Sequence, residues 1–152
     1  MNVKGNLITA WMHLLVFHEL NRLRVTHEWP IEKILPEKTV LLTKNGSVRS
    51  GRFDFLVQTK DKSIGIEVLT RPSQGKLKQK LAYASEVDEF VFVVPKEALE
   101  FYKKKDHKIP SRVRPSFFGK EFKSPNLKAW IVDLADGRIL KKSVFSKVFN
   151  TK

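Results

Sequence analysis

The pattern of apolar and polar residues divides the chain into a helical start, a β-rich middle and a mixed second half. Residues 7–17 are almost wholly apolar and run directly into a polar stretch beginning at His18. A run of about 11 residues is too short for a bilayer, which needs roughly 20, and no small-residue cleavage site follows it. We therefore expect a core helix over residues 5–24.

Alternation and turn signals predict the remaining elements. Lys44-Asn45-Gly46-Ser47 is typical of a hairpin turn, and Lys60-Asp61-Lys62-Ser63 of a second turn. The apolar run at 90–94 is typical of a strand covered on both faces, and the three prolines of 109–125 indicate a loop. The predicted order is strands at 39–43, 51–59 and 64–70, a helix at 76–85, a strand at 90–94, a helix at 96–104 and a hairpin at 130–140. This order predicts one mixed α/β domain.

Composition adds a constraint on partners. The 152 residues carry 29 Lys and Arg against 16 Asp and Glu, a net charge of +13, and residues 68–152 hold +10 of it. Such an excess favours a polyanionic partner, most often nucleic acid. The absence of cysteine excludes a disulfide scaffold, a thiolate zinc site and a cysteine nucleophile. We expect a cytoplasmic protein that associates with the nucleoid when it is bound to DNA.

Cations and aromatic side chains alternate between Lys103 and Lys128, as backbone contact with base stacking would require. An equally open interpretation is a solvated charge run whose phenylalanines pack on the core. The candidate nucleic-acid-binding residues are Lys76, Lys78, Lys103, Lys104, Lys105, Arg112, Arg114, Lys120 and Lys123. The sequence predicts no basic amphipathic helix of useful length, so binding at a membrane surface is disfavoured.

Three acids lie on predicted core elements, which is unexpected in so basic a chain. Glu19 falls on one helical stripe with Met12 and Leu23. Asp54 and Glu67 occupy strands joined by a short turn, so we expect these strands to be antiparallel neighbours. Three carboxylates brought together would suit Mg²⁺ or Mn²⁺ and phosphodiester hydrolysis. The alternative is that each acid pairs with a nearby Lys or Arg.

Strict alternation of the second strand places Phe53, Phe55 and Val57 on one face and Asp54, Leu56 and Gln58 on the other. Among the histidines, His18 fits a core or boundary position of the first helix, with a place near a metal as the minor alternative. The spacing of a zinc hydrolase is missing from the sequence, and so is a glycine-rich phosphate loop.

The segment from Glu19 to about Pro95 resembles the PD-(D/E)XK nuclease superfamily, which includes restriction enzymes, archaeal Holliday-junction resolvases and RecB-type nucleases. Gly51-Arg52-Phe53-Asp54 is similar to the Gly-xx-Asp of the RecB-type branch, and Gln79-Lys80-Leu81-Ala82-Tyr83 to its Gln-xxx-Tyr. The resemblance implies a restriction-endonuclease-like core at about 5–104, a basic loop at about 105–127, and a hairpin and tail at 128–152. It also implies that Glu19, Asp54 and Glu67 hold Mg²⁺ or Mn²⁺.

One departure from the motif stands out, because Leu69 occupies the position of the family's catalytic lysine. Two residues after Glu67 on a strand, it is expected to project into the same pocket. Arg71 or a lysine of the next helix, at 76, 78 or 80, could replace it; Lys80, beside Gln79, is the preferred candidate.

The resemblance implies a metal-dependent endonuclease acting on the backbone of structured or duplex DNA, with little sequence readout and a possible homodimer. The alternatives are a catalytically impaired DNA-binding module in replication or recombination of a mobile element, and an RNA-binding or RNA-processing protein.

Overall fold

The computed structural model describes residues 3–44, 46–71, 74–98 and 126–144. Helix α1 (Val3–Val25) opens the chain, and strands β1 (Ile31–Lys44), β2 (Ser47–Thr59) and β3 (Ser63–Val68) follow it. Helix α2 (Gln74–Leu81) continues into a 3₁₀ turn, η1 (Ala82–Glu86). Strand β4 (Glu89–Pro95) and the hairpin of β5 (Leu127–Asp133) and β6 (Arg138–Val144) complete the fold. The predicted order of elements is confirmed over the described residues.

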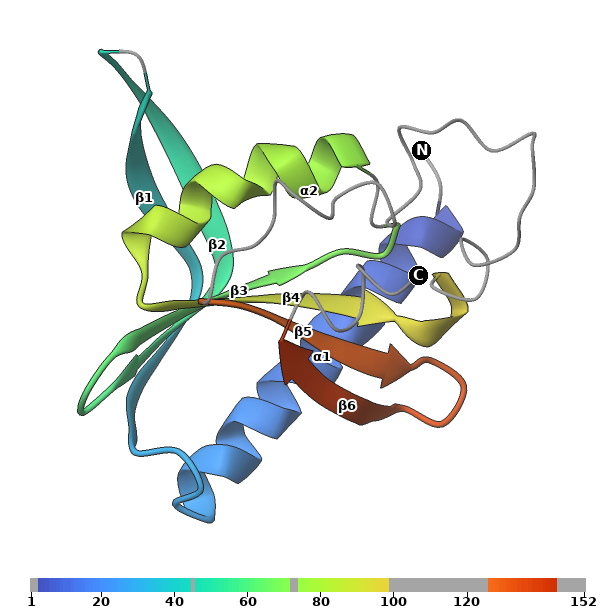
Figure 1. The fold of residues 1–152 in the computed structure, drawn as a ribbon. Helices are drawn as coiled ribbons and strands as arrows, with labels where there is room; N and C mark the ends of the chain where they lie inside the picture. The colour runs from blue at the N-terminus through green and yellow to red at the C-terminus, as the bar shows by residue number, and fades with distance from the viewer. Residues whose placement is uncertain (1–2, 45, 72–73, 99–125, 145–152) are drawn as a thin grey trace.

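The six strands form one mixed sheet in sequence order, β1 to β6 (Figure 1). The pairs β1–β2, β2–β3 and β5–β6 are antiparallel, whereas β3–β4 and β4–β5 are parallel. The β2–β3 pairing confirms the expected antiparallel neighbours. The α2–η1 segment makes the crossover from β3 to the parallel strand β4, as a parallel pair requires. This mixed α/β single domain is consistent with a restriction-endonuclease-like fold.

Helices cover both faces of the sheet. The α1 face is closed by Met12, Val16, Leu20 and Leu23, which pack against β2–β5. On the other face, Tyr83 and Ala84 of η1 pack over β2, β4 and β5. Strand β4 is buried on both sides, because Val91 and Val93 face α1 while Phe90, Phe92 and Val94 face η1. The continuous apolar run at 90–94 is therefore explained by double burial.

Two local predictions are corrected. The stripe of α1 that is fully buried is Met12, Val16, Leu20 and Leu23, so Glu19 lies at the edge of the buried face rather than within it. Phe53 packs on the η1 face while Phe55 and Val57 pack on the α1 face, against strict alternation. The alternation of β2 breaks at Asp54. Across from it on β1 lies Glu37, whose backbone is left-handed with a φ of 52°.

Part of the second half cannot be compared with the predictions. Lys96–Ala98 is helical after Pro95. The rest of the predicted helix to 104 and the predicted loop at 109–125 lie outside the described residues. Within the described residues, no helix is long and apolar enough to cross a membrane.

Candidate active site at the end of strands β2 and β3

Asp54 lies where β2 and β3 separate. The ladder between these strands runs from Gln58–Ser63 to Phe55–Ile66 and ends there. Beyond it, Oδ2 of Asp54 accepts a hydrogen bond from the backbone N–H of Val68 at 2.7 Å. A side-chain carboxylate thus takes the place of the next ladder bond and is fixed beside the end of β3. The second oxygen, Oδ1, lies 3.7 Å from Nε2 of His13 on α1.

Glu67 is the buried member of the site, with only 3% of its surface exposed. Its Oε2 lies 3.4 Å from Nζ of Lys80, while its Oε1 is buried and has no hydrogen-bond partner. Burial, and then the negative charge of Asp54, raise the pKa of Glu67 to about 7, although Lys80 acts in the opposite direction. An unpartnered carboxylate oxygen inside a protein is costly, and either a proton or a bound ligand would satisfy it.

A cleft of about 370 Å³ opens above Asp54 and Lys80. Its lining residues come from the β1–β2 hairpin and from the α2–η1 segment: Thr39, Ser50, Gly51, Arg52, Asp54, Lys80 and Tyr83. The ammonium of Lys80 lies 4.8 Å from the centre of the Tyr83 ring. Tyr83 Oη accepts a hydrogen bond from the backbone N–H of Arg52 at 3.3 Å. The α2–η1 segment and the hairpin are therefore tied together around Asp54.

The glycine of the Gly-xx-Asp sequence has a packing role here. A Cβ at residue 51 would lie 2.5 Å from Tyr83 Oη and 2.9 Å from Cδ1 of Leu42. Only glycine lets the tyrosine approach β2 this closely. Gly51 and Tyr83, which belong to two separate motifs of the sequence, are therefore in direct contact in the fold.

Leu69 does not line the cleft. Ile66 and Val68 face α1, so Leu69 lies on the same face of the sheet as Glu67, as the alternation of a strand predicts. Leu69 is instead buried in the core cluster of Phe53 and Tyr83, and its N–H donates to the carbonyl of Val93 at 2.9 Å. The cation near Glu67 is Lys80, which the helix α2 supplies.

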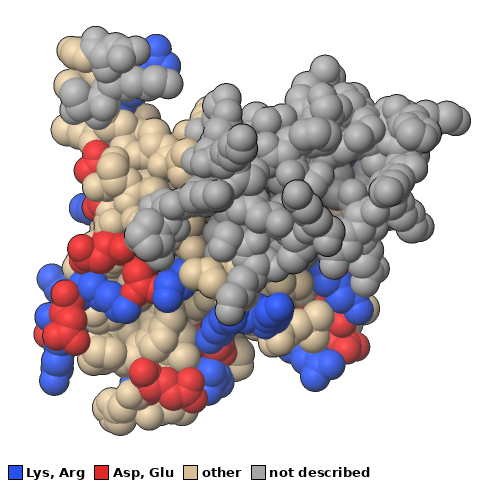
Figure 2. All heavy atoms as spheres, viewed as in Figure 1, with Lys and Arg blue, Asp and Glu red and all other residues tan. Residues whose placement is uncertain are grey.

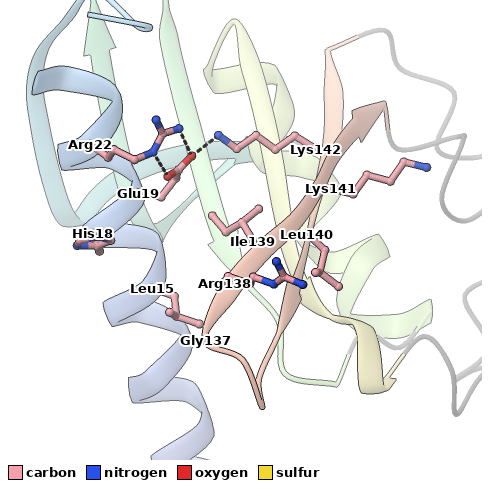
Figure 3. A pocket seen from close by; sticks show the side chains of 10 residues that line it. All are labelled: Leu15, His18, Glu19, Arg22, Gly137, Arg138, Ile139, Leu140, Lys141 and Lys142. Atoms are coloured by element: carbon pink, nitrogen blue, oxygen red, sulfur yellow. Dashed lines mark hydrogen bonds and ion pairs between the residues drawn. The ribbon is translucent and has the colours of Figure 1, made fainter. Parts of the chain in front are cut away.

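Glu19 is not brought to Asp54 and Glu67. Its carboxylate accepts hydrogen bonds from Arg22, with Nε to Oε1 at 2.7 Å, and from Lys142 of β6 (Figure 3). These contacts lie in a separate hollow of about 570 Å³ between α1 and β6. Partial burial acts to raise the pKa of Glu19, but the hydrogen bonds from Arg22 and Lys142 lower it below its usual value. This acid follows the alternative interpretation of a carboxylate paired with basic neighbours.

The α1 side chain that approaches Asp54 is His13, which the sequence reasoning did not select. Six residues separate His13 from Glu19, which is about 240° around a helix and about 9 Å along it, so both cannot face one point. The signal that would have identified His13 is its place beside Met12 and Val16 of the buried stripe. His18, expected at a core or boundary position, is instead exposed and lines the hollow around Glu19.

The described part of the chain contains no group of three or more His, Asp or Glu side chains able to hold a metal ion. The predicted three-carboxylate set is thus reduced to two neighbours. Gln79 and Lys76 are exposed on α2, and Lys78 belongs to the same helix. The predicted DNA contacts at Lys103, Lys104, Lys105, Arg112, Arg114, Lys120 and Lys123 lie outside the described residues.

Comparison with known proteins identifies a fold. No family model and no curated protein matches the sequence. The structure is similar to the crystal structure of an XisH family protein from Nostoc punctiforme PCC 73102, with a TM-score of 0.51 and 12% identity. The similarity covers 88% of this chain and 98% of the other. At this identity the likeness establishes a shared fold, and the chemistry must be argued from the site.

Proposed function

We propose that the protein is a metal-dependent DNA endonuclease of the PD-(D/E)XK type, which hydrolyses the phosphodiester backbone of structured or duplex DNA. One observation carries the proposal: Asp54 and Lys80 line an open cleft at the end of β2 and β3, and the buried carboxylate of Glu67 contacts Lys80. Two carboxylates and an ammonium at one point are the groups that metal-assisted phosphodiester hydrolysis uses. The net charge of +13 supports a polyanionic substrate.

The donor set fits Mg²⁺ or Mn²⁺. Mg²⁺ in enzymes is commonly held by one or two carboxylates, with water and substrate phosphate as its other ligands. Asp54 and Glu67 would supply the two carboxylates, and the unpartnered Oε1 of Glu67 is the oxygen that such an ion would satisfy. A bound ion supplies charge stabilisation at the phosphate and a more acidic water.

The side chains around the carboxylates complete the proposed mechanism. Lys80 stands in for the motif lysine: from α2 it would stabilise the negative charge that develops on the phosphate and orient the attacking water. Gln79, one residue earlier, would contact the same phosphate. His13, at 3.7 Å from Asp54 Oδ1, acts as a positioning residue that fixes the carboxylate.

A catalytically impaired DNA-binding module, acting in replication or recombination of a mobile element, is the second candidate. Two observations favour it: Leu69 stands at the motif position of the lysine, and among the described residues two carboxylates rather than three come together. Such a protein would keep the fold and the charge but would not hydrolyse the backbone.

Cleavage assays separate the two candidates. Wild-type protein is incubated with linear, flapped and four-way DNA in Mg²⁺ and in Mn²⁺, beside Asp54→Asn and a matched Glu19→Gln control. We expect cleavage by the wild type and by Glu19→Gln, and none by Asp54→Asn. No cleavage of any substrate by the wild type would reject the endonuclease and leave the binding module, while equal cleavage by Asp54→Asn would indicate a contaminating nuclease.

A further inference from the structure

Strands β1 and β2 continue past the rest of the sheet as a two-stranded arm, residues 38–44 and 47–53. Seven cross-strand pairs, from Lys38–Phe53 to Lys44–Ser47, hold the arm together. The ladder between β2 and β3 has already ended at Phe55. Six steps of about 3.4 Å give the arm a length of about 20 Å. Its base is packed, because Phe53 is buried and Val40 and Leu42 contact the core on the η1 face. Its tip projects from the body of the molecule at the upper left of Figures 1 and 2.

The arm is basic and exposes apolar side chains. Its four charged residues are all cations: Lys38, Lys44, Arg49 and Arg52. The nearest carboxylate with a recorded contact is that of Glu37, 4.0 Å from Arg52, and both side chains are largely exposed. Residues 46–50 are exposed, and Leu41 and Val48 expose 67% and 62% of their surface. In the register of the two strands, Leu41 and Val48 lie on one face of the arm, and Lys38 and Arg49 lie on the other.

The base of the arm is fixed against the candidate active site. Gly51 packs beneath Tyr83, and the N–H of Arg52 donates to Tyr83 Oη. Thr39, Ser50 and Arg52 of the arm line the cleft that contains Asp54. A ligand lying along the arm would therefore pass directly over Asp54 and Lys80.

The shape of the arm selects among polyanions. The major groove of B-DNA is about 12 Å wide and admits a two-stranded β-ribbon, while the major groove of A-form RNA is too deep and narrow for side chains to read. We propose that this arm enters the major groove of duplex DNA, with the face that carries Leu41 and Val48 against base edges and with Lys38 and Arg49, on the opposite face, on the flanking phosphates. The inference rests on the proposed function and deepens it, because it names the element that would hold duplex DNA at the cleft and the groove that this element would enter.

The test measures binding without metal, so it does not depend on cleavage. Fluorescence anisotropy in EDTA follows the affinity for a 20-base-pair duplex across a salt series. The Lys38→Gln/Arg49→Gln variant is compared with Lys33→Gln, a matched control in which an exposed lysine of β1 outside the arm is neutralised. Each lost phosphate contact reduces the magnitude of the slope of log K against log salt by about 0.9. We therefore expect the slope of the double variant to be smaller by about 1.8, and the slope of the control to equal that of the wild type.

A second variant tests the apolar contacts. Leu41→Ser/Val48→Ser should weaken duplex binding about tenfold while the salt slope stays unchanged, because it removes contacts to bases and none to phosphates. All four arm residues are exposed, and circular dichroism checks that the variants fold. If Lys38→Gln/Arg49→Gln shows the same salt slope as Lys33→Gln, the inference is overturned. Equal losses on single-stranded DNA or hairpin RNA would overturn the major-groove assignment, whatever the cleavage assay shows.

Discussion

Replacing Glu67 with glutamine should remove a large pH dependence from the stability of the metal-free protein. In the fold, burial and the charge of Asp54 raise the pKa of this carboxyl from 4.5 to about 7. The folded state then holds the proton more tightly than the unfolded state does. The stabilisation from protonated Glu67 is fully present below pH 4.5 and is lost as the pH rises towards 7. Above pH 7 the fold contains a buried carboxylate with one unpartnered oxygen.

The size of the effect follows from the two pKa values. At 1.36 kcal/mol per pH unit, the rise from 4.5 to about 7 corresponds to about 3 kcal/mol of unfolding free energy. For a chain of this length that is roughly 10 °C in Tm. Thermal unfolding, followed by circular dichroism in EDTA between pH 4.5 and 8, measures it. The other titrating groups are common to both proteins, so the difference between wild type and Glu67→Gln isolates this one.

We expect Glu67→Gln to gain about 3 kcal/mol relative to the wild type between pH 4.5 and 8. An exposed glutamate of β1, changed as Glu32→Gln, serves as the control and should give a profile parallel to that of the wild type. A constant difference between Glu67→Gln and the wild type across this range would refute the account of Glu67 as a buried, unsatisfied carboxyl.

Two further predictions concern Lys80 and the packing beneath the cleft. Lys80→Ala removes the cation that lowers the pKa of Glu67, so the midpoint of the same stability profile should move to higher pH; an unmoved midpoint would place Lys80 away from Glu67 in solution. Gly65→Ala would put a Cβ 2.5 Å from Cε1 of Phe53, a buried ring held edge-on by Tyr83 and Phe90. We expect a loss of about 1–3 kcal/mol in urea unfolding, and a neutral result would show that the ring can yield.

Local signals predicted much of the fold because they coincide with the tertiary environment. The apolar run of α1, the turn signal between residues 44 and 47 and the apolar run at 90–94 each predict one kind of element. The structure confirms α1 and β4, and it pairs Lys44 with Ser47 as a hairpin requires. Strand β1 begins eight residues before the predicted strand at 39–43. The prediction missed this first part because Pro36 and the left-handed Glu37 interrupt the strand pattern there. Proline is tolerated there since β1 is an edge strand of the sheet.

The candidate site was predictable only in part, because helix rotation decides which acids meet. Asp54 and Glu67 lie on paired strands, where a short turn fixes the register, so the sequence could place them together. Glu19 lies on a helix that is apolar around much of its circumference, and its packing angle brings His13 to Asp54 instead. Which lysine of α2 contacts Glu67 depends on where α2 begins, and no pattern in residues 71–76 defines that start.

Calorimetric titration with Mn²⁺ tests most directly whether Asp54 and Glu67 form a metal site. We expect wild-type protein and Glu19→Gln to bind Mn²⁺ at pH 8, above the pKa of Glu67, and to bind it more weakly at pH 6. Asp54→Asn and Glu67→Gln should bind none under the same conditions. Binding that survives Asp54→Asn, or that is lost in Glu19→Gln, would contradict the two-carboxylate site.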